Sequence, residues 1–253
     1  MLTVSDTAYA IAVVRAREAE LSESERLFED PHARIFAAAG GHAREGTERF
    51  LSLPFFRDGI RLRTRHIDDV VRETITGGAR QLVLMGAGFD ARALRLPEVA
   101  RNDVQAFEID LPALLETKRS LLAGGGIVVP GSVHHVACDF TSGFDARLAE
   151  ELTLRGFDRG GPAMFVWEGV TAYIGQDAID RSLRFMASIG AGGSRLIFDF
   201  SDYLFDPVPA AERTRRAGFT SFCEVSFDEL WRRHLPGEPD PSAQFAKLGI
   251  ASR

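Results

Sequence analysis

The chain has 253 residues with 30 basic and 36 acidic side chains, which gives a net charge of −6. Its length fits one α/β domain, and an acidic chain without a dense basic block argues against nucleic acid or an anionic membrane as a partner. Cys138 and Cys223 are far apart in sequence, which excludes a disulfide framework and a local zinc site. No apolar run approaches the roughly 20 residues of a membrane helix, so we expect a soluble, cytoplasmic protein.

The first part of the chain, residues 3–78, has the pattern of helices alone. Apolar residues recur at helical spacing at Ala8, Ile11 and Val14, and again at Ile67 and Val71. We therefore expect an N-terminal helical cap over residues 1–78.

From Gln81 onward, short apolar runs alternate with helical stretches, which is the pattern of βαβ units. The predicted strands are Gln81–Met85, Val104–Ile109, Val133–Cys138, Ala163–Trp167 and Arg195–Phe200. The predicted helices between them are Leu111–Leu122, Phe144–Arg155 and Asp177–Ile189. This order predicts an α/β fold with a doubly wound, mostly parallel Rossmann-like sheet, and residues 79–253 are expected to form one compact core.

Beyond Asp202 the pattern is weaker. It predicts two helices, at Ala210–Arg216 and Phe227–His234. It also indicates two late strands, at Thr220–Val225 and Gln244–Ile250.

A strand that leads into a glycine turn and then a helix is the sharpest local feature. Gly86 and Gly88 allow a tight turn and close backbone approach to a ligand, beside the amides of the next helix. A dinucleotide-binding dehydrogenase needs such a loop and an acid about 20 residues later, which Glu108 or Asp110 supplies. However, Pro97 breaks the following helix too early for a pyrophosphate site, and no Tyr-x-x-x-Lys pair is present. S-adenosylmethionine has no pyrophosphate and fits the loop better.

Four segments, spaced along the chain, contain motifs that can be compared with those of a known family. They are the loop of residues 86–92, the segment 107–112 with Lys118, Arg63-Thr64-Arg65 with Asp68, and the block over residues 156–173. They resemble, in order and spacing, the G-A-G-x-D-T-R, F-E-x-D-x-P…K, R-T-R…D and G-F-D…F-x-x-E-G-V-x-x-Y elements of the leucine carboxyl methyltransferase family, with Ala91 in place of threonine. The resemblance implies a class I methyltransferase fold, S-adenosylmethionine as cofactor, and, for bacterial-type members, a small-molecule carboxylate as substrate.

The resemblance also implies cofactor-binding roles for residues near the strand ends. Arg63 would pair with the methionine carboxylate, and Gly86 and Gly88 would let the backbone approach the methionine end. Asp110 would accept the ribose hydroxyl protons, with Glu108 as the second choice. The alternatives are a solvated helix-face arginine for Arg63, and solvent exposure or helix capping for either acid.

Further along the chain, Asp139 would accept a hydrogen bond from the adenine amino group while Phe140 covers the ring. The alternative for Asp139 is a helix N-cap. Glu168 follows the fourth strand at the carboxyl edge of the sheet, where open α/β sheets bind ligands, and would face the ammonium or sulfonium group. Glu168 and Tyr173 are the expected catalytic residues, with Tyr173 lining the methyl-transfer pocket unless it is a core residue.

Other polar residues are expected to be structural. Asp90 and Arg92 could pair and shape the glycine loop. A solvated helix face is expected for Arg213, Arg215 and Arg216. His134 and His135 are neighbours on one strand, so one is expected to face the core and the other the opposite side of the sheet.

The sequence contains no convincing catalytic base, which is consistent with carboxyl methylation. A carboxylate, with a pKa of about 4, is already deprotonated at neutral pH. A phenol or alcohol would need a base, for which His66, His134 or His135 would be candidates. We therefore expect a methyl ester on a small-molecule carboxylate, with residues 1–60 of the helical cap lining the acceptor pocket. The alternatives are methyl transfer to a hydroxyl, nitrogen, carbon or sulfur, an NAD(P)-dependent oxidoreductase, and a non-catalytic binding module.

Overall fold

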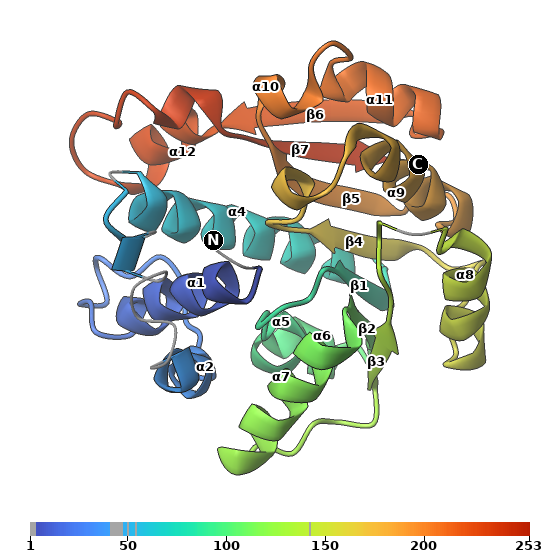
Figure 1. Cartoon of the computed structure of the whole chain (residues 1–253), viewed down its shortest axis with the longest axis horizontal. Helices are drawn as coiled ribbons and strands as arrows, with labels where there is room; N and C mark the ends of the chain where they lie inside the picture. Colours follow the sequence, from blue (N-terminus) through green and yellow to red (C-terminus); the bar gives the residue numbers. More distant parts are fainter. Residues whose placement is uncertain (1–3, 41–47, 50, 54, 142) are drawn as a thin grey trace.

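A seven-stranded sheet forms the centre of the computed structural model, which describes residues 4–40, 48–49, 51–53, 55–141 and 143–253 (Figure 1). The strand order is β3-β2-β1-β4-β5-β7-β6. β1 to β5 are parallel, and β7 is antiparallel to both of its neighbours, which confirms the predicted mostly parallel sheet. The strands are β1 (Gln81–Met85), β2 (Gln105–Asp110), β3 (Val133–Ala137), β4 (Ala163–Trp167), β5 (Arg195–Phe200), β6 (Ser221–Ser226) and β7 (Lys247–Ser252).

The predicted strands match this sheet, with differences at their ends. β1, β4 and β5 have the predicted bounds, β2 and β6 start and end one residue later than predicted, and β3 ends before Cys138. The prediction of a last strand at Gln244–Ile250 is wrong at its start. Ala243–Phe245 forms a short 3-10 helix, η3, and β7 begins only at Lys247.

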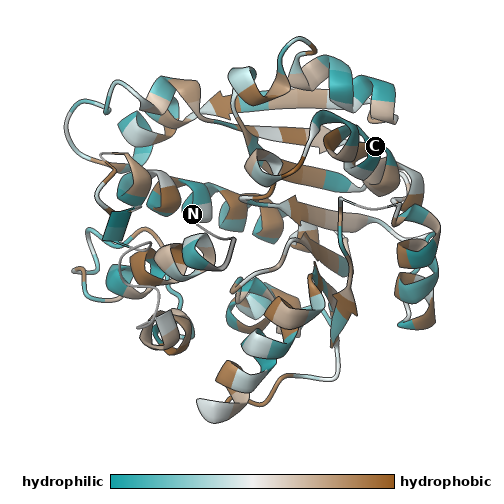
Figure 2. Ribbon diagram, in the orientation of Figure 1, coloured by the Kyte–Doolittle hydropathy of each residue, from teal (hydrophilic) through white to brown (hydrophobic). Residues whose placement is uncertain are grey.

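Helices cover both faces of the sheet because alternate strand residues point to opposite sides. Val83 and Met85 share a buried cluster with α8 (Asp145–Leu154), α9 (Gln176–Ile189) and α11 (Ala210–Ala217). Leu82 and Leu84 share another with α4 (Phe56–Thr76), α6 (Pro97–Arg101) and α12 (Phe227–His234). Hydrophobic residues accordingly run along the central strands, whereas the helices alternate between hydrophobic and hydrophilic residues (Figure 2).

The two N-terminal helices, α1 (Val4–Glu18) and α2 (Ala33–Ala39), pack against each other, and α2 contacts α7 (Pro112–Gly124) (Figure 1). Phe36 of α2 stacks on Phe89 of the glycine loop with 4.8 Å between ring centroids. α4 instead packs on β4 and β5, so it lies in the layers of the core. The boundary at residue 78 stays a prediction, and residues 1–3, 41–47, 50 and 54 of the predicted cap lie outside the described residues.

The helix after the glycine loop is broken, as the early proline predicts. α5 (Arg92–Arg95) ends at Leu96, whose ψ of 113° is extended, and α6 begins at Pro97. A residue before proline avoids the helical region because the proline ring clashes with its backbone. The segment therefore forms two short helices instead of one long one.

The other predicted helices are confirmed, with ends that differ by no more than two residues. Two short elements escaped prediction, η2 (Thr171–Tyr173) and α10 (Asp202–Phe205). Within the described ranges no helix is both long enough and apolar enough to span a bilayer.

Candidate active site

A pocket opens at the carboxyl ends of β1 to β4, where the strand order reverses between β1 and β4. Open α/β sheets bind ligands at this position. The pocket encloses about 1010 Å³, open solvent included, and α1 supplies one wall through residues that include Thr7, Ile11 and Arg15. The predicted site residues that line it are Arg63, Gly86, Gly88, Asp110, Asp139, Phe140, Glu168 and Tyr173.

The glycine loop has a backbone that other residues would strain. Gly86 and Gly88 have φ angles of 75° and 45°, in the left-handed region that glycine adopts without steric cost. A Cβ at Gly86 would lie 2.3 Å from Cγ2 of Val170, whereas a Cβ at Gly88 would meet no atom within 4 Å. Gly86 is therefore fixed by packing as well as by conformation, and Gly88 by conformation alone.

Asp110, at the end of β2, fastens the glycine loop from the neighbouring strand. Its Oδ2 accepts a hydrogen bond from the Gly88 backbone nitrogen at 2.7 Å, and its Oδ1 accepts one from the Leu111 nitrogen at 2.7 Å. The two backbone N–H groups lower the pKa of the Asp110 carboxyl, but burial has the larger effect and raises this pKa above its ordinary value. Asp110 is thus a buried acceptor at the pocket wall.

Glu108, the second choice for the ribose, does not reach the pocket. Its carboxylate is buried and lies 2.6 Å from the Nζ atom of Lys118 on α7 and 3.1 Å from Nε2 of His135 on β3. Lys118 also donates a hydrogen bond to the carbonyl oxygen of Asp90. Glu108 therefore holds Lys118 in place, and Lys118 in turn holds the glycine loop through the Asp90 carbonyl.

Glu168, directly after β4, accepts hydrogen bonds from three arginines. Arg15 Nη2 and Arg63 Nε donate to Oε1 at 2.7 and 2.8 Å, and Arg92 Nη1 donates to Oε2 at 2.6 Å. Burial alone would raise the pKa of Glu168, but the three guanidinium charges hold it well below its ordinary value. Glu168 is therefore a fixed anion in the pocket.

Arg63 of α4 is a buried cation with one free donor. Its Nε contacts Glu168, and its Nη1 donates to Oδ2 of Asp199 on β5 at 2.8 Å. Its Nη2 is buried and has no hydrogen-bond partner among the described residues. The solvated helix-face alternative is wrong for Arg63, since its side chain is buried.

Sequence reasoning missed two members of this cluster. Arg15 is buried on α1, and Asp199 lies inside β5, where its Oδ1 accepts a hydrogen bond from the Gly169 nitrogen at 2.6 Å. A carboxylate in the middle of the otherwise apolar run Leu196–Phe200 was the available signal for Asp199. Arg15 had no such signal, because its partner Glu168 is 153 residues away.

The segment after β3 brings Asp139 and Phe140 to the rim of the pocket. Asp139 is exposed, and its Oδ1 accepts hydrogen bonds from the backbone nitrogen and Oγ1 of Thr141 at 2.9 and 2.7 Å, which lower its pKa. The N-cap alternative is not supported, because the first turn of α8 has no side-chain cap. Phe140 is buried and packs edge-on against Phe144.

Tyr173, in η2, joins the pocket to α1. Its hydroxyl lies 2.7 Å from Oγ1 of Thr7, and its side chain is 44% exposed, so it is not a core tyrosine. Together with the Arg15–Glu168 ion pair, this contact holds α1 against the end of the sheet.

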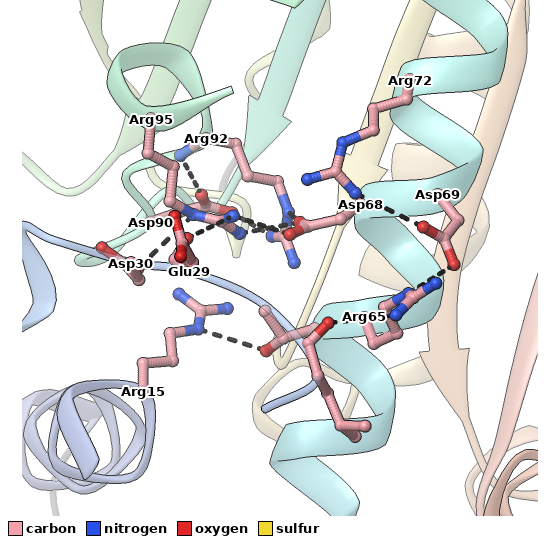
Figure 3. Close-up of polar contacts among 12 residues, drawn as sticks. Arg15, Glu29, Asp30, Arg65, Asp68, Asp69, Arg72, Asp90, Arg92 and Arg95 are labelled. Atoms are coloured by element: carbon pink, nitrogen blue, oxygen red, sulfur yellow. Dashed lines mark hydrogen bonds and ion pairs between the residues drawn. The ribbon is translucent and has the colours of Figure 1, made fainter. Parts of the chain in front are cut away.

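Arg92 organises the charges behind the pocket (Figure 3). Its Nε donates to Oδ1 of Asp68 at 2.7 Å, its guanidinium contacts Asp90, and its backbone nitrogen donates to Oδ1 of Asp90 at 2.8 Å. Arg95 also converges on Asp68, at 2.6 and 2.7 Å, as Figure 3 shows. The prediction that Asp90 and Arg92 pair and shape the loop is confirmed.

Residues 8–187 match the leucine carboxyl methyltransferase family, over more than half of the chain. The chain belongs to this family. A Streptomyces coelicolor relative, named for S-adenosyl-L-methionine-dependent methyl transfer, is 34% identical over 200 residues, which cover 75% of this chain and 67% of the relative. A Mycobacterium avium protein with the same type of name is 33% identical over 243 residues, which cover 90% of this chain and 76% of that protein.

Solved structures share the fold of this methyltransferase. A Thermobifida fusca methyltransferase matches with a TM-score of 0.61 and 18% identity, over 99% of this chain and 94% of that one. A Streptomyces avermitilis protein of the duf574 family matches with a TM-score of 0.53 and 14% identity, over 98% and 97%. The fold and the relatives confirm a methyltransferase and bear out S-adenosylmethionine as its cofactor, so the oxidoreductase alternative is set aside.

Arg213 also differs from its prediction. Arg213 is buried, donates to Asp180 at 2.5 Å and lies 5.4 Å from the centroid of the Phe205 ring. The prediction that Arg213 lies on a solvated helix face is therefore wrong, because α11 packs on α9, which carries Asp180. Arg215 and Arg216 are exposed as predicted.

The three candidate histidines lie away from the site. His134 contacts Gln105 at 3.0 Å, and His135 contacts Glu108. His66 is half-buried on α4, and none of the three lines the pocket.

Proposed function

We propose that this methyltransferase forms a methyl ester on the carboxylate of a small molecule, with S-adenosylmethionine as the methyl donor. The unpartnered Nη2 of Arg63 supports the cofactor part of the proposal, because it is a buried cationic donor in a pocket that also holds the fixed anion Glu168. A ligand with a carboxylate beside an ammonium group, such as the methionine end of the cofactor, supplies an acceptor for Arg63 Nη2 and places a positive charge beside Glu168.

The other pocket residues fit the rest of the cofactor. Asp110 is a buried acceptor beside the glycine loop and suits the ribose hydroxyls. Phe140 and Asp139 offer an aromatic face and a carboxylate for the adenine ring and its amino group. The positive φ angles of Gly86 and Gly88 let the loop backbone border the pocket between these groups.

The chain's task in the reaction is alignment and exclusion of water. When bound, the cofactor supplies an electrophilic methyl group on a sulfonium. A carboxylate acceptor, with a pKa of about 4, arrives deprotonated and needs no base. An alcohol or phenol would need one, and the three candidate histidines line neither this pocket nor the cavity beside it at the end of β5. This supports a carboxylate as the acceptor.

Binding of the product S-adenosylhomocysteine tests the cofactor assignment. We expect it to raise the unfolding temperature, since a ligand at about 100 times its Kd stabilises by about 2.7 kcal/mol. Arg63→Ala should weaken binding about ten- to a hundredfold, because a hydrogen bond to a charged group is lost. Arg65→Ala is the matched control, since Arg65 lies on the same helix, is paired with Asp69 and does not line the pocket.

The chemical stability of the product tests the acceptor class. A methyl ester releases labelled methanol in mild alkali, whereas a methyl ether or methylamine keeps its label. Alkali-labile label in an extract of small molecules treated with labelled S-adenosylmethionine is the expected result. Label that survives alkali would contradict carboxyl methylation.

A further inference from the structure

A second cavity adjoins the first on the side of β5. It encloses about 770 Å³, open solvent included. The two cavities share five residues, which form their common wall: Thr7, Ile11, Arg63, Gly169 and Tyr173. A molecule in the second cavity therefore lies beside the methionine-binding residues of the first.

Most of the lining of the second cavity is apolar. Phe56 and Ile60 come from α4, Phe200 ends β5, Leu204 lies on α10 and Phe227 begins α12. Ile60, Phe200 and Phe227 are buried. These elements come from both ends of the chain, and such a wall suits an aryl or alkyl body.

Charge is confined to one end of the second cavity. Among the described residues that line it, the charged side chains are Arg63 and Asp199, which pair at 2.8 Å. Asp199 also accepts the Gly169 N–H, so both of its oxygens have partners. The first cavity, by contrast, is lined by Arg15, Arg63 and four carboxylates.

We propose that the second cavity is the methyl-acceptor site and that it takes an acid with one carboxylate on an apolar aryl or alkyl body. This rests on the proposed function, which places the methionine end at the shared wall. The acceptor carboxylate lies at this wall, next to the hydroxyls of Thr7 and Tyr173, and the body extends toward Phe200 and Phe227. A second carboxylate on the ligand would be buried against apolar side chains without a cation, which is costly.

The positive charge that the acceptor needs then comes from the cofactor, since Arg63 is paired with Glu168 and Asp199 and its free donor is assigned to the methionine carboxylate. In the reaction a carboxylate oxygen forms a bond to the methyl carbon while the carbon–sulfur bond breaks. The electron pair stays on sulfur, the sulfonium becomes a neutral thioether, and no proton moves. The acceptor site therefore favours a positively charged group in the cofactor position.

Calorimetry with 4-phenylbutyrate tests this site in the full chain. The protein is first saturated with sinefungin, which carries an ammonium group in place of the sulfonium, or with S-adenosylhomocysteine, whose thioether sulfur is neutral. We expect 4-phenylbutyrate to bind the sinefungin form about fivefold or more tightly than the other form, and adipate to bind about tenfold or more weakly than 4-phenylbutyrate. Equal binding of adipate, or no binding of 4-phenylbutyrate to either form, overturns the proposal.

Two cavity-filling variants locate the binding site. Leu204→Trp and Ala246→Trp each occupy the second cavity, and neither residue lines the first. Each should weaken 4-phenylbutyrate binding about tenfold or more while sinefungin binding stays within about twofold. Leu154→Trp, on the exposed face of α8, is the control.

The outcomes separate the two proposals. Unchanged 4-phenylbutyrate binding in both variants overturns the acceptor site alone. Failure of the wild-type chain to bind either cofactor analogue contradicts the proposed function instead.

Discussion

Arg92 and Glu168 form a buried ion pair, with 2.6 Å between Nη1 and Oε2. The pair ties the segment after the glycine loop to the end of β4, two regions that are 76 residues apart in sequence. Because the same guanidinium also contacts Asp68 and Asp90, a single side chain links three carboxylates around the pocket.

Arg92→Ala should strongly destabilise the protein. It leaves the buried Asp90 carboxylate without the cation that contacts it and removes one of the cations that contact Asp68 and Glu168. Breaking a buried pair in this way costs about 3–5 kcal/mol. Urea unfolding measures the loss of free energy, and Arg215→Ala, which removes an exposed arginine, should leave the midpoint unchanged. A loss below about 1 kcal/mol would show that the carboxylates find other partners.

Glu168→Gln should reduce cofactor affinity with little change in shape. The amide keeps the size of the side chain but removes the negative charge that would face the methionine ammonium. We expect S-adenosylhomocysteine binding to weaken about ten- to a hundredfold by calorimetry. Glu151→Gln, on α8 and away from the pocket, should bind S-adenosylhomocysteine like the wild type. Equal affinity for this ligand in both variants would contradict the role of Glu168.

Gly86→Ala should destabilise the glycine loop more than Gly88→Ala. Both substitutions strain a positive-φ position by about 1–2 kcal/mol, but only the Cβ at Gly86 collides with Val170. Overpacking adds about 1–3 kcal/mol, which thermal unfolding detects. The double variant Gly86→Ala with Val170→Ala should recover the packing part of the loss, and no recovery would show that backbone strain alone matters.

Acid should destabilise the protein partly through Glu168. The folded-state pKa of this carboxyl lies below its ordinary value of 4.5. Its contribution to the free energy of unfolding is therefore complete above about pH 4.5 and is lost as the pH falls toward the folded-state pKa. Asp110 acts in the opposite direction, because burial raises its pKa. Its contribution to the free energy of unfolding falls as the pH rises. Urea midpoints between about pH 7 and pH 3 should therefore fall less steeply in Glu168→Gln than in the wild type. Parallel curves would contradict this linkage.

Much of the fold could be predicted from sequence because its signals are local. The apolar runs Gln81–Met85 and Ala163–Trp167 are buried on both faces, and such strands stand out from the helices between them. The carboxyl ends of parallel strands meet at one edge, which is why Gly86, Asp110 and Glu168 come together as expected.

The remaining features depend on partners distant in sequence. Glu108 and Asp110 are equivalent in sequence pattern, but Glu108 pairs with the buried Lys118 on α7 whereas Asp110 accepts the Gly88 N–H at the pocket. Arg213 has the sequence pattern of a surface residue, but Asp180 on α9 and the Phe205 ring make a buried site for it. Such pairings follow from helix packing, which periodicity alone does not encode.

The position of α1 has a consequence for ligand exchange. Thr7 and Ile11 line both cavities, and the helix is held by the Thr7–Tyr173 contact at one point and by the Arg15–Glu168 pair at another. A displacement of this one helix would therefore open both cavities together. We expect departure of the methyl ester and replacement of the spent cofactor to share a single gate.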